Sequence, residues 1–113
     1  MIEVTIPIKT VGGLNAREHW RVRSNRVKNE RYATRFELCS QDVPHLPCIV
    51  TMTRLSPGTL DSDNLQGAAK AIRDQVADFL GVNDNDPRVS WKYAQEKCPR
   101  GKFGVRVRIE TTA

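Results

Sequence analysis

The sequence has few of the residues from which zinc sites and disulfide frameworks are built. It contains three cysteines, Cys39, Cys48 and Cys98, which are far apart and form no C-x-x-C pair, and two histidines, His19 and His45. This pattern argues against a zinc site and against a disulfide framework. We expect three reduced thiols in a cytoplasmic protein, packed as small hydrophobic side chains.

Long hydrophobic runs are also missing. The first apolar stretch, MIEVTIPI, alternates between apolar and polar residues. It is far shorter than the roughly 20 residues that cross a membrane, and it lacks the basic start and the cleavage site of a signal sequence. We therefore expect no membrane partner and interpret this stretch as a β-strand.

Length and composition predict one globular domain. With 113 residues, of which 39% are hydrophobic and 27% charged, the chain can bury a single core without a disulfide or a metal ion to support it. Its six prolines and seven glycines are scattered, and no repeat or low-complexity segment is present. We expect residues 1–113 to form a single domain.

Positive charge is concentrated in the first half of the chain. The net charge is +5, and residues 15–41 alone contain seven basic and three acidic residues, a net charge of +4. An uneven basic surface suits a polyanion such as a nucleic acid, although a solvated helix face has the same composition. Both interpretations stay open on charge alone.

The first helix is expected over residues 15–38. Asn15 can cap it, and Glu18 three residues later can complete a capping box. The expected buried stripe consists of Ala16, Trp20, Val27, Phe36 and Leu38. The wider opposite face carries the basic residues Arg17, Arg21, Arg23, Lys28, Arg31 and Arg35. These basic side chains are the candidate contacts to DNA phosphates.

The rest of the chain is expected to contain a second helix and several strands. The strands are expected at 2–9, 48–55, 88–95 and 102–111. The helix is expected from Asp63 to Leu80, and it ends at Gly81 as a C-cap. Its buried positions follow helical spacing at Leu65, Ala69, Ile72, Val76 and Phe79 or Leu80. The order β-α-β-α-β-β predicts an α+β fold, with a mixed sheet packed against two helices.

Two aspartates, Asp61 and Asp63, stand one residue apart where this second helix begins. At about 5 Å in a medium of intermediate dielectric, two carboxylates repel by about 3 kcal/mol. Either the pair serves as a helix cap and a turn, or a bound cation offsets the repulsion. Two further acids, Asp84 and Asp86, lie in the loop after the helix, which in a simple β-α-β unit is at the opposite end. The four acids converge only if the loop 81–88 folds back, or if the following strand carries Asp86 alongside the end of the strand at 48–55.

The acidic motifs resemble those of the RusA family of Holliday junction resolvases, endonucleases common in prophages. The likeness consists of the run D-S-D-N-L at 61–65, an alanine-rich helix, and an acidic loop that ends in D-x-x-V at 86–89. It covers about Cys48 to Glu110, and the basic amino-terminal helix is compatible with it.

This resemblance implies a Mg2+-dependent homodimer that cuts paired strands of a four-way DNA junction in a bacterial host cell. The first two acids of the family map onto Asp61 and Asp63. The third maps best onto Asp86, with Asp84 as the alternative. All of these acids are candidate metal ligands, and the family's loops bring them together.

The chain departs from the family pattern at two positions. Gly67 stands where the family usually has a lysine, one turn after the second aspartate, and Lys70 is the candidate replacement in catalysis. Leu60 stands where a basic residue often precedes the first aspartate, and Arg54 or Arg73 could supply that charge. Both arginines are also candidate contacts to DNA. A non-catalytic DNA-binding phage protein, a degenerate relative of the same family, is therefore the alternative.

Two further alternatives concern particular side chains. Trp20 and Trp91 either pack in the core or stack on bases exposed at a branch point. The aspartates could instead act as acid and base in an enzyme for small molecules, which would bind no DNA.

Overall fold

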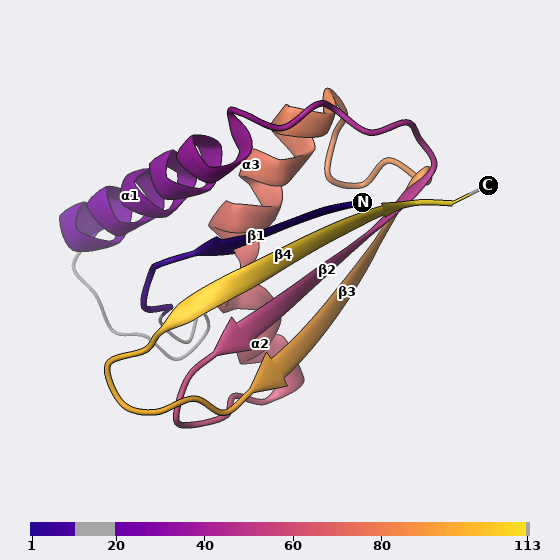
Figure 1. Ribbon diagram of the computed structural model, residues 1–113. Helices are drawn as coiled ribbons and strands as arrows, with labels where there is room; N and C mark the ends of the chain where they lie inside the picture. The colour runs from indigo at the N-terminus through magenta and orange to yellow at the C-terminus, as the bar shows by residue number, and fades with distance from the viewer. Residues whose placement is uncertain (11–19, 113) are drawn as a thin grey trace.

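A four-stranded mixed sheet forms one layer of the protein, and helices cover one of its faces (Figure 1). The structure is a computed structural model in which residues 1–10 and 20–112 are described. Its elements are β1 (Ile2–Ile6), α1 (Trp20–Leu38), β2 (Cys48–Leu55), α2 (Ser62–Ala68), α3 (Lys70–Leu80), β3 (Val89–Glu96) and β4 (Gly104–Thr111). The predicted α+β class and element order are confirmed, except that the second helix is divided into α2 and α3.

The sheet has the strand order β1-β4-β2-β3. Strand β2 lies near its centre, parallel to β3 and antiparallel to β4, and β1 pairs antiparallel with the other side of β4. The two parallel strands therefore begin at the same end of the sheet, with Cys48 opposite Val89. Strand β1 ends at Ile6 instead of residue 9, since Pro7 has no N–H to donate to a ladder.

The core lies between the covered sheet face and α1 and α3. Its fully buried side chains come from β1, β2, β4 and both helices and include Ile6, Val50, Met52, Val107, Ile109, Leu38, Ile72 and Val76. Burial of an aliphatic side chain of this size stabilises the fold by about 1.5–3 kcal/mol. The pattern predicted for residues 65–80 is confirmed, because its apolar positions pack into this core.

The break between α2 and α3 falls at Ala69. This residue has φ −93° and ψ −1°, which departs from α-helical values, and its N–H is shared between the carbonyl groups of Leu65 and Gln66. Gly67, a poor helix former, lies just before the break. The C-terminal end is as predicted, because Gly81 caps α3 in the left-handed conformation at φ 75°.

Helix α1 buries only part of the stripe expected for it: Leu38 is buried as predicted and Val27 is half-buried. Its buried residues are Glu30, Thr34 and Leu38, whereas Trp20 is 66% exposed and Phe36 is 65% exposed. Two polar residues can be buried here because both have local partners: the Thr34 hydroxyl donates to the Glu30 carbonyl group, and Arg26 pairs with the Glu30 carboxylate.

The prediction was therefore wrong for Trp20 and Phe36. The predicted cap residues Asn15 and Glu18, together with Ala16, Arg17 and His19, lie outside the described residues. Of the three free cysteines, Cys48 is buried as expected, Cys98 is half-buried and Cys39 is exposed.

Candidate nucleic-acid site

The first acidic pair lies at the amino-terminal end of α2. Asp61 is the N-cap, and its Oδ1 accepts hydrogen bonds from the Asn64 backbone N–H at 2.9 Å and from Asn64 Nδ2 at 3.0 Å. Its Oδ2 accepts from Asn64 Nδ2 at 3.1 Å. Asn64 is buried, so it holds the Asp61 carboxylate in one orientation. Asp61, and not Asp63, is therefore the cap of this helix.

Asp63 lies in the first turn of α2, where the helix dipole favours a carboxylate. Its side chain is exposed. Within the described part of the chain, no hydrogen bond or ion pair engages this carboxylate. It is thus the acid of the set that is most available to a ligand from solution.

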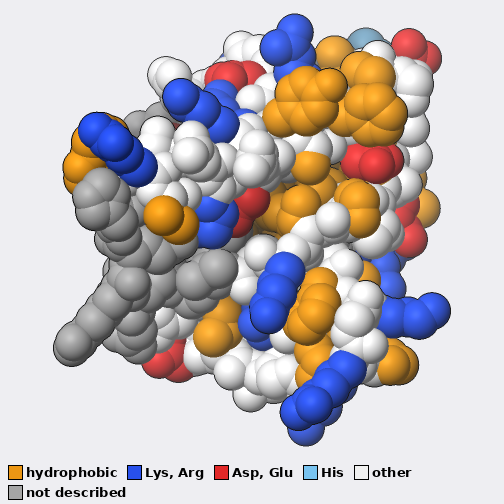
Figure 2. Space-filling model, turned by 90° about the vertical axis from the view of Figure 1, so that its left-hand side faces the viewer, with side chains coloured by type: hydrophobic (Ala, Val, Ile, Leu, Met, Phe, Trp, Pro, Cys, Tyr) orange, Lys and Arg blue, Asp and Glu red, His pale blue; other side chains and the backbone are white. Residues whose placement is uncertain are grey.

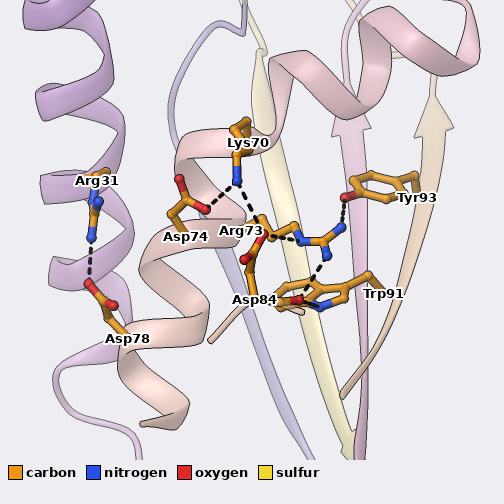
Figure 3. A network of polar contacts seen from close by, with 8 residues as sticks. All are labelled: Arg31, Lys70, Arg73, Asp74, Asp78, Asp84, Trp91 and Tyr93. Atoms are coloured by element: carbon orange, nitrogen blue, oxygen red, sulfur yellow. Dashed lines mark hydrogen bonds and ion pairs between the residues drawn. The ribbon is translucent and has the colours of Figure 1, made fainter. Parts of the chain in front are cut away.

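The acidic loop folds back along α3, as convergence of the acids requires. Asp84 Oδ2 lies 3.2 Å from Lys70 Nζ and 3.4 Å from Arg73 Nε, close to the amino-terminal end of α3 (Figure 3). The Asp84 carbonyl group accepts hydrogen bonds from Arg73 Nη2 at 2.9 Å and from Trp91 Nε1 at 2.8 Å. Asp84 is therefore held at the amino-terminal end of α3, whereas Asp61 and Asp63 lie at the opposite, amino-terminal end of α2.

Asp86 has a different environment. Its carboxylate accepts hydrogen bonds from the backbone N–H, Nε and Nη2 of Arg88, at 2.8–3.1 Å. These bonds lower the pKa of Asp86 to about 2. Asp86 and Arg88 line a shallow hollow with Asp78 and Gly81, at the carboxyl end of α3. The loop therefore carries Asp84, the alternative third ligand, back toward α2, whereas Asp86 stays at the carboxyl end of α3.

The three-acid metal site that the resemblance implies is not formed in this arrangement. Among the residues that the structure describes, which include all four aspartates, no three carboxylate, imidazole or thiol groups gather closely enough to hold a metal ion. The donor set does suit Mg2+ at the first pair, since this ion is commonly held by one or two carboxylates together with waters and substrate phosphates. Asp61 and Asp63 are the residues that fit it.

Lys70 is directed at acids of its own chain. Its Nζ donates to Asp74 at 2.9 Å and to Asp84 at 3.2 Å, and these partners, Asp74 first, raise its pKa. Lys70 and Gly67 also line a hollow of about 250 Å3 between α1 and α3, together with Arg23 and Arg26. The lysine therefore stays charged, held by two carboxylates, beside a hollow whose lining also includes the acidic residues Glu30 and Asp74.

Arg73 lies inside a network and not on the DNA-facing surface that was expected for it. Its guanidinium group lies 4.6 Å from the centre of the Trp91 ring, and Nη1 donates to the Tyr93 hydroxyl at 2.8 Å. Arg73 Nε lies 3.4 Å from Asp84 Oδ2, which is within ion-pair distance, but the two atoms do not form a hydrogen bond. Core packing is confirmed for Trp91, which is half-buried against the core. This network fixes the acidic loop to α3 and β3 (Figure 3).

Two other predicted DNA contacts are also engaged within the chain. Arg31 binds Gln75 and Asp78 of α3, and Arg54 donates to the Thr10 hydroxyl at 2.9 Å and to the Gly58 carbonyl group at 3.2 Å. Four of the predicted contacts are exposed on α1, namely Arg21, Arg23, Lys28 and Arg35. Arg17 lies outside the described residues.

Figure 2 shows the side of the molecule on which α1 lies, where lysine and arginine side chains alternate with apolar ones. Two exposed aromatic residues of α1 were missed as functional candidates. Tyr32 is 71% exposed, and Phe36, which was assigned to the core, is 65% exposed. Their spacing of four residues was visible in the sequence, but hydrophobic side chains are expected to be buried first.

The protein is a small α+β domain with a basic helix, α1, and an aspartate-capped helix, α2. Its acidic loop folds back to the amino-terminal end of α3. Comparisons with protein-family models, with curated proteins and with solved structures found no match to this chain. In the part of the chain that is described, no helix has both the length and the apolar character needed to cross a membrane.

Proposed function

We propose that this protein binds branched DNA, such as a four-way junction, and cleaves it as a Mg2+-dependent endonuclease. The observation that carries the proposal is the return of the acidic loop. This loop brings Asp84 to Lys70, at the end of α3 that follows the D-S-D-N-L turn. Of the two later acids, Asp84 is the one that this loop holds at the end of α3 nearest the turn, where Lys70, Arg73 and Trp91 engage it.

In this proposal each residue of the turn has a separate role. Asp61 and Asp63 would hold Mg2+, and Asn64 orients the Asp61 carboxylate through three hydrogen bonds. When bound, such an ion would neutralise phosphate charge and lower the pKa of a water molecule bound to it. Lys70 places one positive charge beside the hollow between α1 and α3, and it would attract a phosphate while it holds Asp84 in place.

Binding itself would come from the exposed basic residues of α1. Arg21, Arg23, Lys28 and Arg35 are positioned to contact phosphates, which position a protein on DNA without reading its sequence. Each phosphate contact releases counterions, so affinity should fall as salt concentration rises.

A second candidate function, DNA binding without cleavage, is favoured by a specific observation. Lys70 and Asp84 satisfy each other, and Arg88 neutralises Asp86, so that two of the candidate metal ligands already have cationic partners. Gly67 also leaves the family's lysine position without a charge.

Incubation with a labelled four-way junction, in Mg2+ and in EDTA, tests the proposal. We expect strand cleavage in Mg2+ only, and we expect Asp63→Asn to abolish it while binding in EDTA is kept. Asp42→Asn, which removes an exposed aspartate in the loop after α1, is the matched control and should cut like the parent. A gel shift without cleavage would favour the second candidate, and full activity of Asp63→Asn would contradict the assignment of the metal site.

A further inference from the structure

The outer surface of α1 carries a pair of exposed aromatic side chains, which no other element in the described part of the chain covers. Tyr32 is 71% exposed and Phe36 is 65% exposed. Residues four apart on a helix are neighbours on one face, so the two rings form one patch, which we call the aromatic pair. Leaving two rings in water has a free-energy cost, and such a patch commonly marks a binding surface.

A row of basic residues lies along one side of the aromatic pair. Arg21, Lys28 and Arg35 are seven residues apart, so they lie almost on one line along α1, at intervals of about 10 Å. Lys28 is four residues before Tyr32, and Arg35 is three residues after it, which makes both of them surface neighbours of that ring. Within the described residues, no ion pair engages Lys28 or Arg35. We call Arg21, Lys28 and Arg35 the basic row.

Charge decides which partner fits this surface. Helix α1 has six basic and two acidic residues, a net charge of +4. A second copy docked through the same face would place this charge against itself, because a two-fold contact pairs identical patches. An acidic protein would satisfy the charges without needing two flat rings. A nucleic acid with unpaired bases satisfies both features, since bases stack on aromatic rings while phosphates bind lysine and arginine.

We propose that the aromatic pair stacks on unpaired bases of single-stranded or branched DNA, with the basic row on the adjoining phosphates. The inference rests on the proposed function for its choice of DNA as the ligand, but not on cleavage. It assigns to α1 a preference for unpaired bases in addition to salt-dependent affinity. Tyr32 and Phe36 are on the surface, so their replacement leaves the core intact.

Fluorescence anisotropy in EDTA, with a labelled oligothymidylate and a blunt duplex of equal length, tests this inference. For the double variant Tyr32→Leu with Phe36→Leu we expect affinity for the oligothymidylate to fall at least about fivefold, whereas affinity for the duplex stays nearly unchanged. Tyr32→Phe keeps a ring and should bind like the parent. Lys28→Gln should weaken both complexes, and Lys102→Gln, in the turn before β4, should weaken neither.

A stacking-specific signal separates base contact from a general effect on the helix. With 2-aminopurine in an unpaired position, the parent should quench its fluorescence on binding, and the double variant should quench it less. Unchanged affinity for oligothymidylate in the double variant would overturn the inference and leave the proposed function standing. Loss of a parent dimer in the double variant, seen by sedimentation, would make this face a self-interface and also overturn it. If the parent bound neither DNA, both proposals would fail.

Discussion

Removal of the Arg73 guanidinium group should destabilise the fold, because this group holds the acidic loop to α3 and β3. Arg73→Met keeps the apolar stem that packs along α3 but removes the charged group. Two charge-assisted hydrogen bonds are lost, to the Tyr93 hydroxyl at 2.8 Å and to the Asp84 carbonyl group at 2.9 Å, together with the contact to the Trp91 ring at 4.6 Å.

The magnitude follows from these contacts. A hydrogen bond that involves a charged group contributes about 1.5–3 kcal/mol, and a cation–π contact contributes about 0.5–2 kcal/mol. Water can replace part of these interactions in the variant, because the Arg73 side chain is 23% exposed and that of Asp84 is 35% exposed. We expect a loss of about 3 kcal/mol in the free energy of unfolding. For a chain of this length this corresponds to a fall in Tm of about 12 °C.

Urea denaturation followed by circular dichroism measures this loss. Arg31→Met is the matched control, because Arg31 also forms an ion pair with an aspartate, Asp78. This pair is in solvent: the Arg31 side chain is 38% exposed and that of Asp78 is 61% exposed. Exposed pairs contribute about 0–1 kcal/mol. Equal losses in the two variants would refute the argument that the half-buried Arg73 network holds the acidic loop.

Two further predictions concern the acids themselves. Asp61→Ala should lower the free energy of unfolding by about 1 kcal/mol, whereas Asp61→Ser should keep most of the cap, as urea denaturation would show. The pKa of Asp86 is lowered to about 2 by Arg88, so the stability that this pairing contributes is present above about pH 4 and is lost as the pH falls toward 2. In Arg88→Gln, the pKa of Asp86 read from its carboxyl NMR signal should rise above that of the parent, because the guanidinium hydrogen bonds are lost while the backbone N–H of residue 88 still donates. An unchanged titration curve would show that the Arg88 side chain is not the cause.

Much of the fold could be predicted, because strands and helices leave periodic patterns in the sequence. The alternation of Val105, Val107 and Ile109 with arginines predicted β4, and the helical spacing of Ile72 and Val76 predicted the buried face of α3. The buried stripe of α1 could not be predicted in this way. Its members Glu30 and Thr34 are polar, and only their local hydrogen bonds make them suitable for burial.

The candidate site could be predicted less completely. The spacing of Asp61 and Asp63 indicated a helix start, and the structure places both there. The path of the acidic loop depends on contacts between residues far apart in the chain, such as Trp91 Nε1 with the Asp84 carbonyl group. Single-sequence periodicity does not record such contacts. For the same reason Arg73 was assigned to DNA when its partners are Asp84, Trp91 and Tyr93.

The most direct test of the central claim is the salt dependence of binding to a four-way junction, measured in EDTA so that cleavage does not interfere. We expect log affinity to fall linearly with log salt concentration. The slope should decrease in magnitude by about 0.9 in Lys28→Gln and again in Arg35→Gln, since each replacement removes one phosphate contact. Absence of binding at low salt, or a slope that neither variant changes, would contradict the account of α1 as the DNA-binding surface.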